Sequence, residues 1–296
     1  MKKMEFEEVG AVKSITQAQI LQAVHLVKKG KLYDLDCGRW NKMPVADAHP
    51  PFQVLSYRTP QGIQNQKDQQ QWLGQNTVNM AWNSEMIMGT VHSGTHIDAL
   101  NHITCGHDNH WFGGVPSATH TGDFGTLLSD ASKIPPIVTK GVLLDVAKAL
   151  GFDVLPKGYK ITPDDIHKTL SLQNVNISRG DAVLIRTGYM SVWPDTERMA
   201  QHYGSGIDLE TARLLAEAGA VVIGGDNESL EVIPSPDPEN PHPVHIELLV
   251  NRGVYIMEMV FQEQLARDQA YEFLFVCLPL NISGATGSMV RPIAMV

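Results

Sequence analysis

The hydrophobic and polar positions change their pattern near the middle of the chain. From residue 38 to residue 75 the sequence is rich in Pro, Gly, Gln and Asn, and its apolar runs are short and without a helical period. This pattern is typical of loops and short strands. From residue 141 onward, continuous apolar runs alternate with amphipathic segments, as in proteins whose strands and helices alternate. The first half is therefore predicted to be irregular, and the second half to be α/β.

The second half contains recognisable strands and helix ends. Short continuous apolar runs predict buried strands, and they occur at 141–145, 182–187, 220–224, 254–260 and 273–280. One helix is predicted to begin at its cap Thr162, with Pro163 in the first position. Others are predicted from Asp208 to Gly219 and over residues 245–251, closed by Gly253. Because no repeat, low-complexity tract or linker is evident in the sequence, a single domain is predicted over residues 1–296, with 1–30 as an N-terminal extension.

Composition and charge narrow the class of partner. The chain has 296 residues, 43% of them hydrophobic, and a formal net charge of -9. An acidic surface without clustered Lys or Arg does not attract nucleic acid or an anionic membrane, so a small-molecule partner is expected. Three widely spaced cysteines, no secretory h-region and no apolar run of 18 residues predict a cytoplasmic protein without disulfides or membrane spans.

The chemistry concentrates in one run, His92-Ser-Gly-Thr-His96-Ile-Asp98-Ala-Leu-Asn-His102. Imidazole and carboxylate are the ligands that zinc, manganese and iron take from proteins. The spacings between His92, His96 and Asp98 can bring all three side chains to one point if Gly94 allows a sharp turn. A solvated polar loop is the alternative for any single histidine, but it explains the whole string poorly. The apolar run at 86–88 predicts a strand that delivers this motif.

Glu258 and His245 are further candidates from a distant segment. Glu258 interrupts an otherwise apolar strand, where an unpaired carboxylate costs several kcal/mol or becomes protonated. A bound metal explains its presence; the alternative is a strand-end carboxylate that faces water or pairs with Arg252 or Arg291. His245 lies near a predicted helix start, where a histidine is often merely exposed.

Several other residues are candidates for substrate contact. Asp226 lies after a buried strand, with Glu228 and Glu231, where α/β proteins place ligand-binding loops, although a solvated acidic loop is an equal alternative. Trp82 and Phe52 could line a pocket for a flat ring, or simply belong to the core. Ser93 and Cys105 lack the sequence signature of a nucleophile with its base, so water is the better nucleophile beside a metal.

The motif resembles the signature of the metal-dependent cyclase-like hydrolases, a family that includes bacterial kynurenine formamidases, isatin hydrolases and trans-dienelactone hydrolases. The segments 141–145, 225–234 and 245–258 are similar to it as well, so the resemblance covers roughly residues 33–280. The sequence departs from the commonest pattern at Leu100, where proline is frequent, and at Ile103, where phenylalanine is frequent. Neither position is a ligand.

The resemblance implies a fold and a set of roles. The fold is a single α/β domain of the swivelling β/β/α type, with a mixed sheet and flanking helices. His92, His96 and Asp98 would bind a first zinc or manganese ion. Asp98, His245 and Glu258 could hold a second, and His102 would carry the proton. Family members are commonly homodimers or homotetramers, so a homo-oligomer is expected.

The predicted activity is metal-dependent hydrolysis of a small formamide, cyclic amide or lactone, the last as in trans-dienelactone hydrolases. A rival hypothesis takes His96, Asp98 and His245 as the two-histidine, one-carboxylate triad of a non-haem iron oxygenase. It leaves His92, His102 and Glu258 without a role. A third hypothesis is a non-catalytic metal-binding protein.

Overall fold

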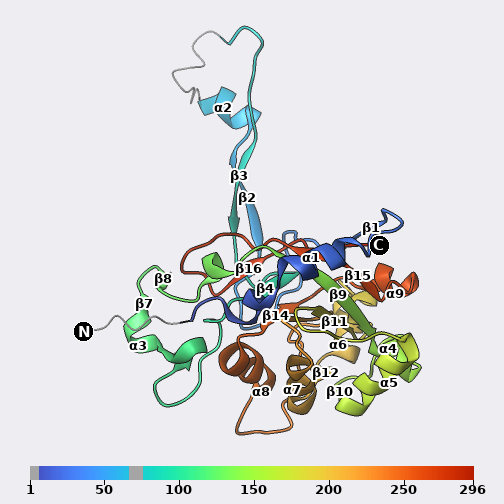
Figure 1. Cartoon of the computed structure of the whole chain (residues 1–296). Coiled ribbons are helices and arrows are strands. Elements are labelled where there is room, and N and C mark those ends of the chain that lie inside the picture. Colours follow the sequence, from blue (N-terminus) through green and yellow to red (C-terminus); the bar gives the residue numbers. More distant parts are fainter. Residues whose placement is uncertain (1–6, 67–75) are drawn as a thin grey trace.

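The computed structural model describes residues 7–66 and 76–296, and its core is a mixed sheet of nine strands (Figure 1). Their order across the sheet is β1-β17-β15-β9-β11-β13-β14-β4-β16. In this order the strands span Leu32–Asp34, Ile293–Met295, Glu272–Cys277, Ile137–Asp145, Ala182–Arg186, Val222–Gly225, Tyr255–Glu258, His96–Asp98 and Gly287–Met289.

The centre of the sheet is parallel and its two sides are antiparallel. Strands β9, β11, β13 and β14 are parallel neighbours, while β4 runs antiparallel to β14 and β15 runs antiparallel to β9. Strands buried on both faces read as continuous apolar runs, which is why these four, and β15, were recognisable in the sequence. All five predicted strands of the second half are confirmed.

Helices cover both faces of this sheet (Figure 1). Helix α1 (Gln17–Val24) packs on β9 and β15, on the opposite side from α4 (Val146–Leu150), α5 (Pro163–Gln173) and α7 (Leu209–Glu217). Val12, just before α1, is 4% exposed and joins the main hydrophobic cluster. The described part of the predicted N-terminal extension is therefore packed against the body.

The predicted helix ends are confirmed. The Thr162 side chain accepts a hydrogen bond from the Asp165 amide and forms a capping box at the start of α5, and Asp208 accepts one from the Thr211 amide at the start of α7. The predicted helix at 245–251 consists of α8 (Pro243–His245) and the π-helical segment η6 (Ile246–Arg252). It ends at Gly253, whose φ of 64° suits glycine.

The first half is irregular, as predicted, and part of it leaves the body as an arm. Strands β2 (Gln53–Arg58) and β3 (Ser84–Met88) pair into a separate hairpin that projects from the body, with α2 (Pro60–Gln66) beyond it (Figure 1). The apolar run at 86–88 is thus a strand, but it does not carry the histidine motif into the main sheet. A turn separates the two, and the motif forms its own strand, β4.

The remaining elements are short. They are η1 (Gly10–Ser14), β5 (His110–Trp111), η3 (Phe112–Gly114), β6 (Val115–Pro116), α3 (Ser117–His120), β7 (Thr121–Gly122), β8 (Gly125–Thr126), η4 (Ala131–Lys133), β10 (Lys160–Ile161), η5 (Tyr189–Ser191), α6 (Thr196–His202), β12 (Gly206–Ile207) and α9 (Glu263–Arg267). No helix in the described part of the chain is long and apolar enough to cross a membrane. The predicted fold class, a single α/β domain with a mixed sheet and flanking helices, is confirmed.

Candidate metal centre

Three neighbouring strands bring the histidine motif together with Glu258. In the register of the antiparallel pair, Glu258 at the end of β14 lies opposite His96 in β4, and Asp98 lies opposite Gly287 in β16. His96, Asp98 and Glu258 are only 3%, 1% and 7% exposed. Charged or ionisable groups are rarely buried unless each is paired, so the geometry between them decides what the cluster can do.

The motif approaches its strand through a tight turn. Gly94 has a φ of 59°, as the sequence predicted, and His92 lies before this turn. His92 packs so closely on β16 that a Cβ at Gly287 would lie 2.7 Å from its Cε1 atom. The approach of this imidazole therefore depends on a glycine in the strand beside it.

Two carboxylates lie between two imidazoles. His96 Nε2 is 3.2 Å from Glu258 Oε2 and 3.6 Å from Asp98 Oδ1. His245 Nε2 is 3.3 Å from Glu258 Oε1 and 3.8 Å from Asp98 Oδ2. Each carboxylate thus presents one oxygen to each histidine. The Asp98 Oδ2 atom is buried and has no hydrogen-bond partner among the described residues.

Outer contacts fix which nitrogen of each imidazole faces the carboxylates. His96 Nδ1 donates to the Gly94 carbonyl oxygen over 2.7 Å, and His245 Nδ1 donates to the buried Glu231 carboxylate. Each histidine therefore directs Nε2 into the cluster, as metal-binding histidines do when an outer acceptor holds their other nitrogen.

The charge balance of the cluster calls for a cation. Burial by itself lowers the pKa of His245, but its hydrogen bonds to Glu231 and Glu258 outweigh this and raise the pKa to about 10. Burial raises the pKa of Asp98, yet the neighbouring His102, His92 and His96 hold it well below its usual range. Protons or a metal ion can supply the positive charge that these carboxylates favour.

His92 and His102 complete the cluster on its other side. His92 Nδ1 is 2.8 Å from Asp98 Oδ1, and the His92 and His102 rings lie 4.1 Å apart between centroids. Burial lowers the pKa of His102 to about 4, although the charge of Asp98 opposes the shift. His102 is therefore a neutral imidazole within reach of the site.

The donor set fits a divalent metal ion. The ligand atoms of His92, His96 and Asp98 lie within 4.8 Å of one another, and so do those of Asp98, His102 and His245. Asp98 belongs to both groups, and its unpartnered buried oxygen is what an absent cation would leave. Imidazole nitrogen with carboxylate oxygen suits zinc or manganese.

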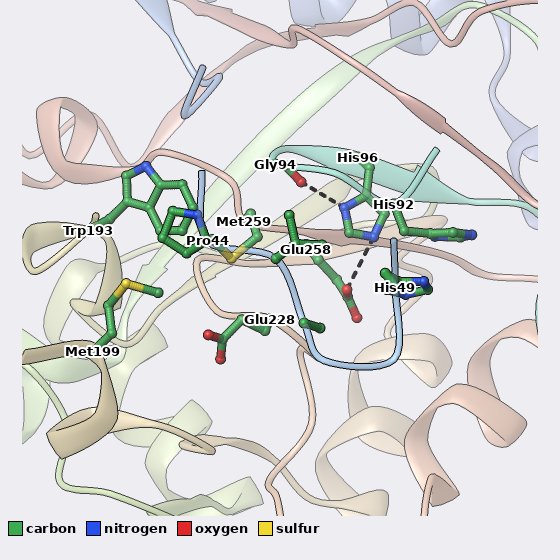
Figure 2. A pocket seen from close by; sticks show the side chains of 12 residues that line it. Pro44, His49, His92, Gly94, His96, Trp193, Met199, Glu228, Glu258 and Met259 are labelled. Atoms are coloured by element: carbon green, nitrogen blue, oxygen red, sulfur yellow. Dashed lines mark hydrogen bonds and ion pairs between the residues drawn. The ribbon is translucent and has the colours of Figure 1, made fainter. Parts of the chain in front are cut away.

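A small pocket opens beside this cluster (Figure 2). It has a volume of about 80 Å³. Figure 2 shows His92 and His96 on one side, the apolar side chains of Pro44, Trp193 and Met199 on the other, and two carboxylates between them. The lining residues are Pro44, Val45, Ala46, His49, His92, Gly94, His96, Trp193, Met199, Glu228, Glu258 and Met259.

The structure places the three predicted substrate-contact residues outside this lining. Asp226 is fully buried and accepts hydrogen bonds from the Thr187 amide and hydroxyl and from the Gly188 amide, so it holds a turn. Phe52 is buried at the base of the arm, close to Gly89, and Trp82 lies just before β3. Neither aromatic side chain therefore lines the pocket.

Other residues gained or changed a role. His49 and Glu228 line the pocket, and the His49 and His92 rings stack with their centroids 5.3 Å apart. The sequence carries no signal for His49, which lies 43 positions before His92 in the chain.

Cys105 has a possible base, since its Sγ is 3.6 Å from His110 Nε2. That pair lies outside the pocket lining, so water stays the better nucleophile in the cluster.

Comparison with known proteins agrees with this geometry. Residues 33–232 match the model of a family described as "Putative cyclase". A solved structure of a novel cyclase is 29% identical, with a TM-score of 0.84, and the alignment covers 98% of this chain and 96% of that one. Among curated proteins, no sequence matches significantly.

More distant solved structures share the fold. Isatin hydrolase A from Labrenzia aggregata, bound to benzyl benzoate, is 21% identical with a TM-score of 0.65 over 94% of this chain and 98% of that one. An isatin hydrolase bound to the product analogue thioisatinate is 18% identical, with a TM-score of 0.62 over 95% and 99%. Because the family model matches well over half of the 296 residues, the chain belongs to this cyclase family.

Proposed function

We propose that this protein is a metal-dependent hydrolase that cleaves a small amide, formamide or cyclic amide, with a lactone as the alternative substrate. The observation that carries the proposal is the pair of buried carboxylates, Asp98 and Glu258, each facing both His96 and His245 beside a pocket. Such a cluster is costly to bury unless a cation neutralises it.

The chain offers ligands for one or two ions. His92, His96 and Asp98 would hold the first zinc or manganese ion, and Asp98, His245 and Glu258 a second. When bound, such an ion lowers the pKa of a water molecule toward neutrality and polarises a carbonyl group. Glu231 would keep the His245 tautomer fixed through its hydrogen bond to Nδ1.

His102 is the residue we assign to proton transfer. Its ring lies against His92 and 6.3 Å from the His245 ring between centroids, so it borders both groups of ligands. A neutral imidazole there can take a proton from the attacking water and return it to the departing nitrogen or oxygen. His102→Ala is expected to keep bound metal while losing about 100-fold or more in kcat.

The pocket and the solved relatives suggest the kind of substrate. The pocket is small and the wall opposite the histidines is apolar, which favours a small substrate with an apolar part. Three of the structural neighbours are isatin hydrolases, and one of them is bound to the product analogue thioisatinate. A cyclic amide is therefore the first substrate to test, followed by a formamide and a lactone.

The test is elemental analysis of the purified protein followed by assays with isatin, N-formylkynurenine and a dienelactone. We expect zinc or manganese to copurify, turnover of at least one compound, and loss of turnover after chelation. Asp123→Asn, on the exposed turn between β7 and β8, is the control variant that should keep both metal and activity.

Two other outcomes would favour the rival hypotheses. Oxygen consumption with ferrous iron and no hydrolysis would support the oxygenase triad of His96, Asp98 and His245. Against that triad, Glu258 lies closer than Asp98 to the Nε2 atoms of both histidines. Tight metal binding without turnover of any compound would support a binding protein.

A further inference from the structure

Among the described residues, two carboxylates line the pocket, and of these Glu258 is the one that pairs with the histidines of the cluster. Glu228 follows β13 and lines the pocket, and in Figure 2 it lies between Met199 and Glu258. It accepts a hydrogen bond from the Tyr189 hydroxyl. Glu228 is therefore a hydrogen-bond acceptor held in the space where a substrate would lie.

The partner of Glu228 is rigidly supported. Tyr189 is 1% exposed and packs in a small hydrophobic cluster with Met190, Val192, Met199 and Met259. The turn before it is held by Asp226, which accepts hydrogen bonds from Thr187 and Gly188. Asp226 was predicted to contact the substrate. It instead holds the turn before Tyr189, and Tyr189 in turn holds Glu228.

The pocket lining, drawn from the described residues, includes neither a Lys nor an Arg that could pair with Glu228. Its histidines, His49, His92 and His96, lie on the side of the metal centre. Arg39 packs beside Gly94, but its guanidinium already donates to the carbonyl oxygens of Ser93 and Thr95 and to Asp36. A carboxylate facing apolar walls without a second donor favours a ligand that brings one.

We propose that Glu228 determines specificity by accepting a hydrogen bond from an N–H group next to the scissile carbonyl of the substrate. The site would then select amides over lactones of the same shape. This inference rests on the proposed hydrolytic function and names the substrate class of that site.

The physical basis is the difference between the ring nitrogen of a cyclic amide and the ring oxygen of a lactone. An amide nitrogen carries a hydrogen that can donate to the carboxylate, and hydrogen bonds to charged groups are the stronger kind. The ring oxygen of a lactone presents only lone pairs, which a carboxylate repels. A site built around such a donor discriminates strongly against a ligand that lacks it.

The first experiment measures binding, so it does not depend on turnover. Oxindole is a flat cyclic amide, benzofuran-2-one is its lactone isostere, and N-methyloxindole lacks the N–H. We expect calorimetry with the zinc-loaded full chain to show oxindole binding about 10- to 100-fold more tightly than N-methyloxindole. In Glu228→Gln this affinity ratio should fall to about threefold or less, because the glutamine side chain keeps the shape of glutamate but loses the charged acceptor.

Control variants separate specificity from steric or folding effects. Glu239→Gln makes the same chemical change at an exposed loop position and should keep the full gap. Tyr189→Phe removes the hydroxyl that holds Glu228 and should narrow the gap partly. An unchanged affinity ratio in Glu228→Gln would mean that the methyl group of N-methyloxindole is excluded by its size, and this would overturn the inference. The inference is also overturned if the wild-type protein binds the two compounds equally or binds neither.

The second experiment uses turnover and separates the two proposals. We expect Glu228→Gln to lower the ratio of kcat/KM for isatin to that for benzofuran-2-one by about 10- to 100-fold relative to the wild-type protein. An unchanged ratio would overturn the specificity role. If the wild-type protein hydrolyses neither compound, the hydrolase proposal fails for these substrates, while the binding comparison still decides the role of Glu228.

Discussion

Folded proteins usually bury apolar side chains and expose charged ones, and the metal centre and the β2–β3 arm each reverse one half of this rule. At the centre, carboxylates and imidazoles are buried, with Asp98 only 1% exposed. On the arm, apolar side chains face outward, with Ile87 62% exposed and Tyr57 63% exposed. The two regions are neighbours in sequence, since β3 ends at Met88 and the motif begins at His92.

The difference shows what each region needs from outside the chain. Polar groups at the centre are paired with one another, but their summed charge favours a cation. The arm is a two-stranded hairpin, which is marginally stable in water by itself, and it presents apolar residues on both faces: Val54 and Ile87 on one, Leu55 and Met86 on the other. Exposed apolar patches of this kind mark interaction surfaces. The homo-oligomer that the family resemblance implies would supply a second copy to cover the arm.

The largest expected effect comes from the shared ligand of the centre. Asp98→Asn removes the charge that faces both His96 and His245, so zinc affinity should fall by more than the 10- to 100-fold that losing an outer partner costs. Calorimetric titration of the metal-free protein with zinc measures this. Asp123→Asn is the matched control, and unchanged affinity in Asp98→Asn would show that the buried carboxylates are only a salt-bridge network.

A smaller effect is expected one contact farther out. Glu231→Gln keeps an acceptor for His245 Nδ1 but removes its charge, so zinc affinity should fall by about 10- to 100-fold. The same titration tests this, with Glu239→Gln as the control. If Glu231→Gln lowered zinc affinity as much as Asp98→Asn, Glu231 could not be described as a residue that only supports the ligand His245.

The smallest expected effect, about 10-fold in the dimer dissociation constant, comes from the arm. The pair Leu55→Ser and Ile87→Ser removes one apolar side chain from each face and should weaken self-association without changing metal content. Sedimentation velocity over a concentration series measures it. Leu172→Ser, at a position 64% exposed on α5, is the control. A wild-type protein that is monomeric at every concentration would refute the expectation and leave the arm for another partner.

Local pattern was sufficient for much of the fold. The strands at 141–145, 182–187 and 254–260 and the caps Thr162 and Asp208 depend on neighbouring residues, so the sequence reveals them. His92, His96 and Asp98 likewise lie within seven positions and meet across a single turn at Gly94. A site made from one short segment can be predicted because its geometry is set by a few backbone angles.

The tertiary structure decided everything that depends on register and on contacts between distant segments. Glu258 meets His96 only because β14 and β4 pair in one antiparallel register, and a slip of one residue would turn the carboxylate to the other face. His49 and Glu228 reach the pocket from loops that carry no periodic pattern, whereas Asp226 was drawn into the interior by backbone amides. The sequence by itself determined which residues can bind a metal, because ligand chemistry belongs to the side chain. Only the packing of the sheet decided which carboxylates face the ligand, because burial and pairing are properties of the whole fold.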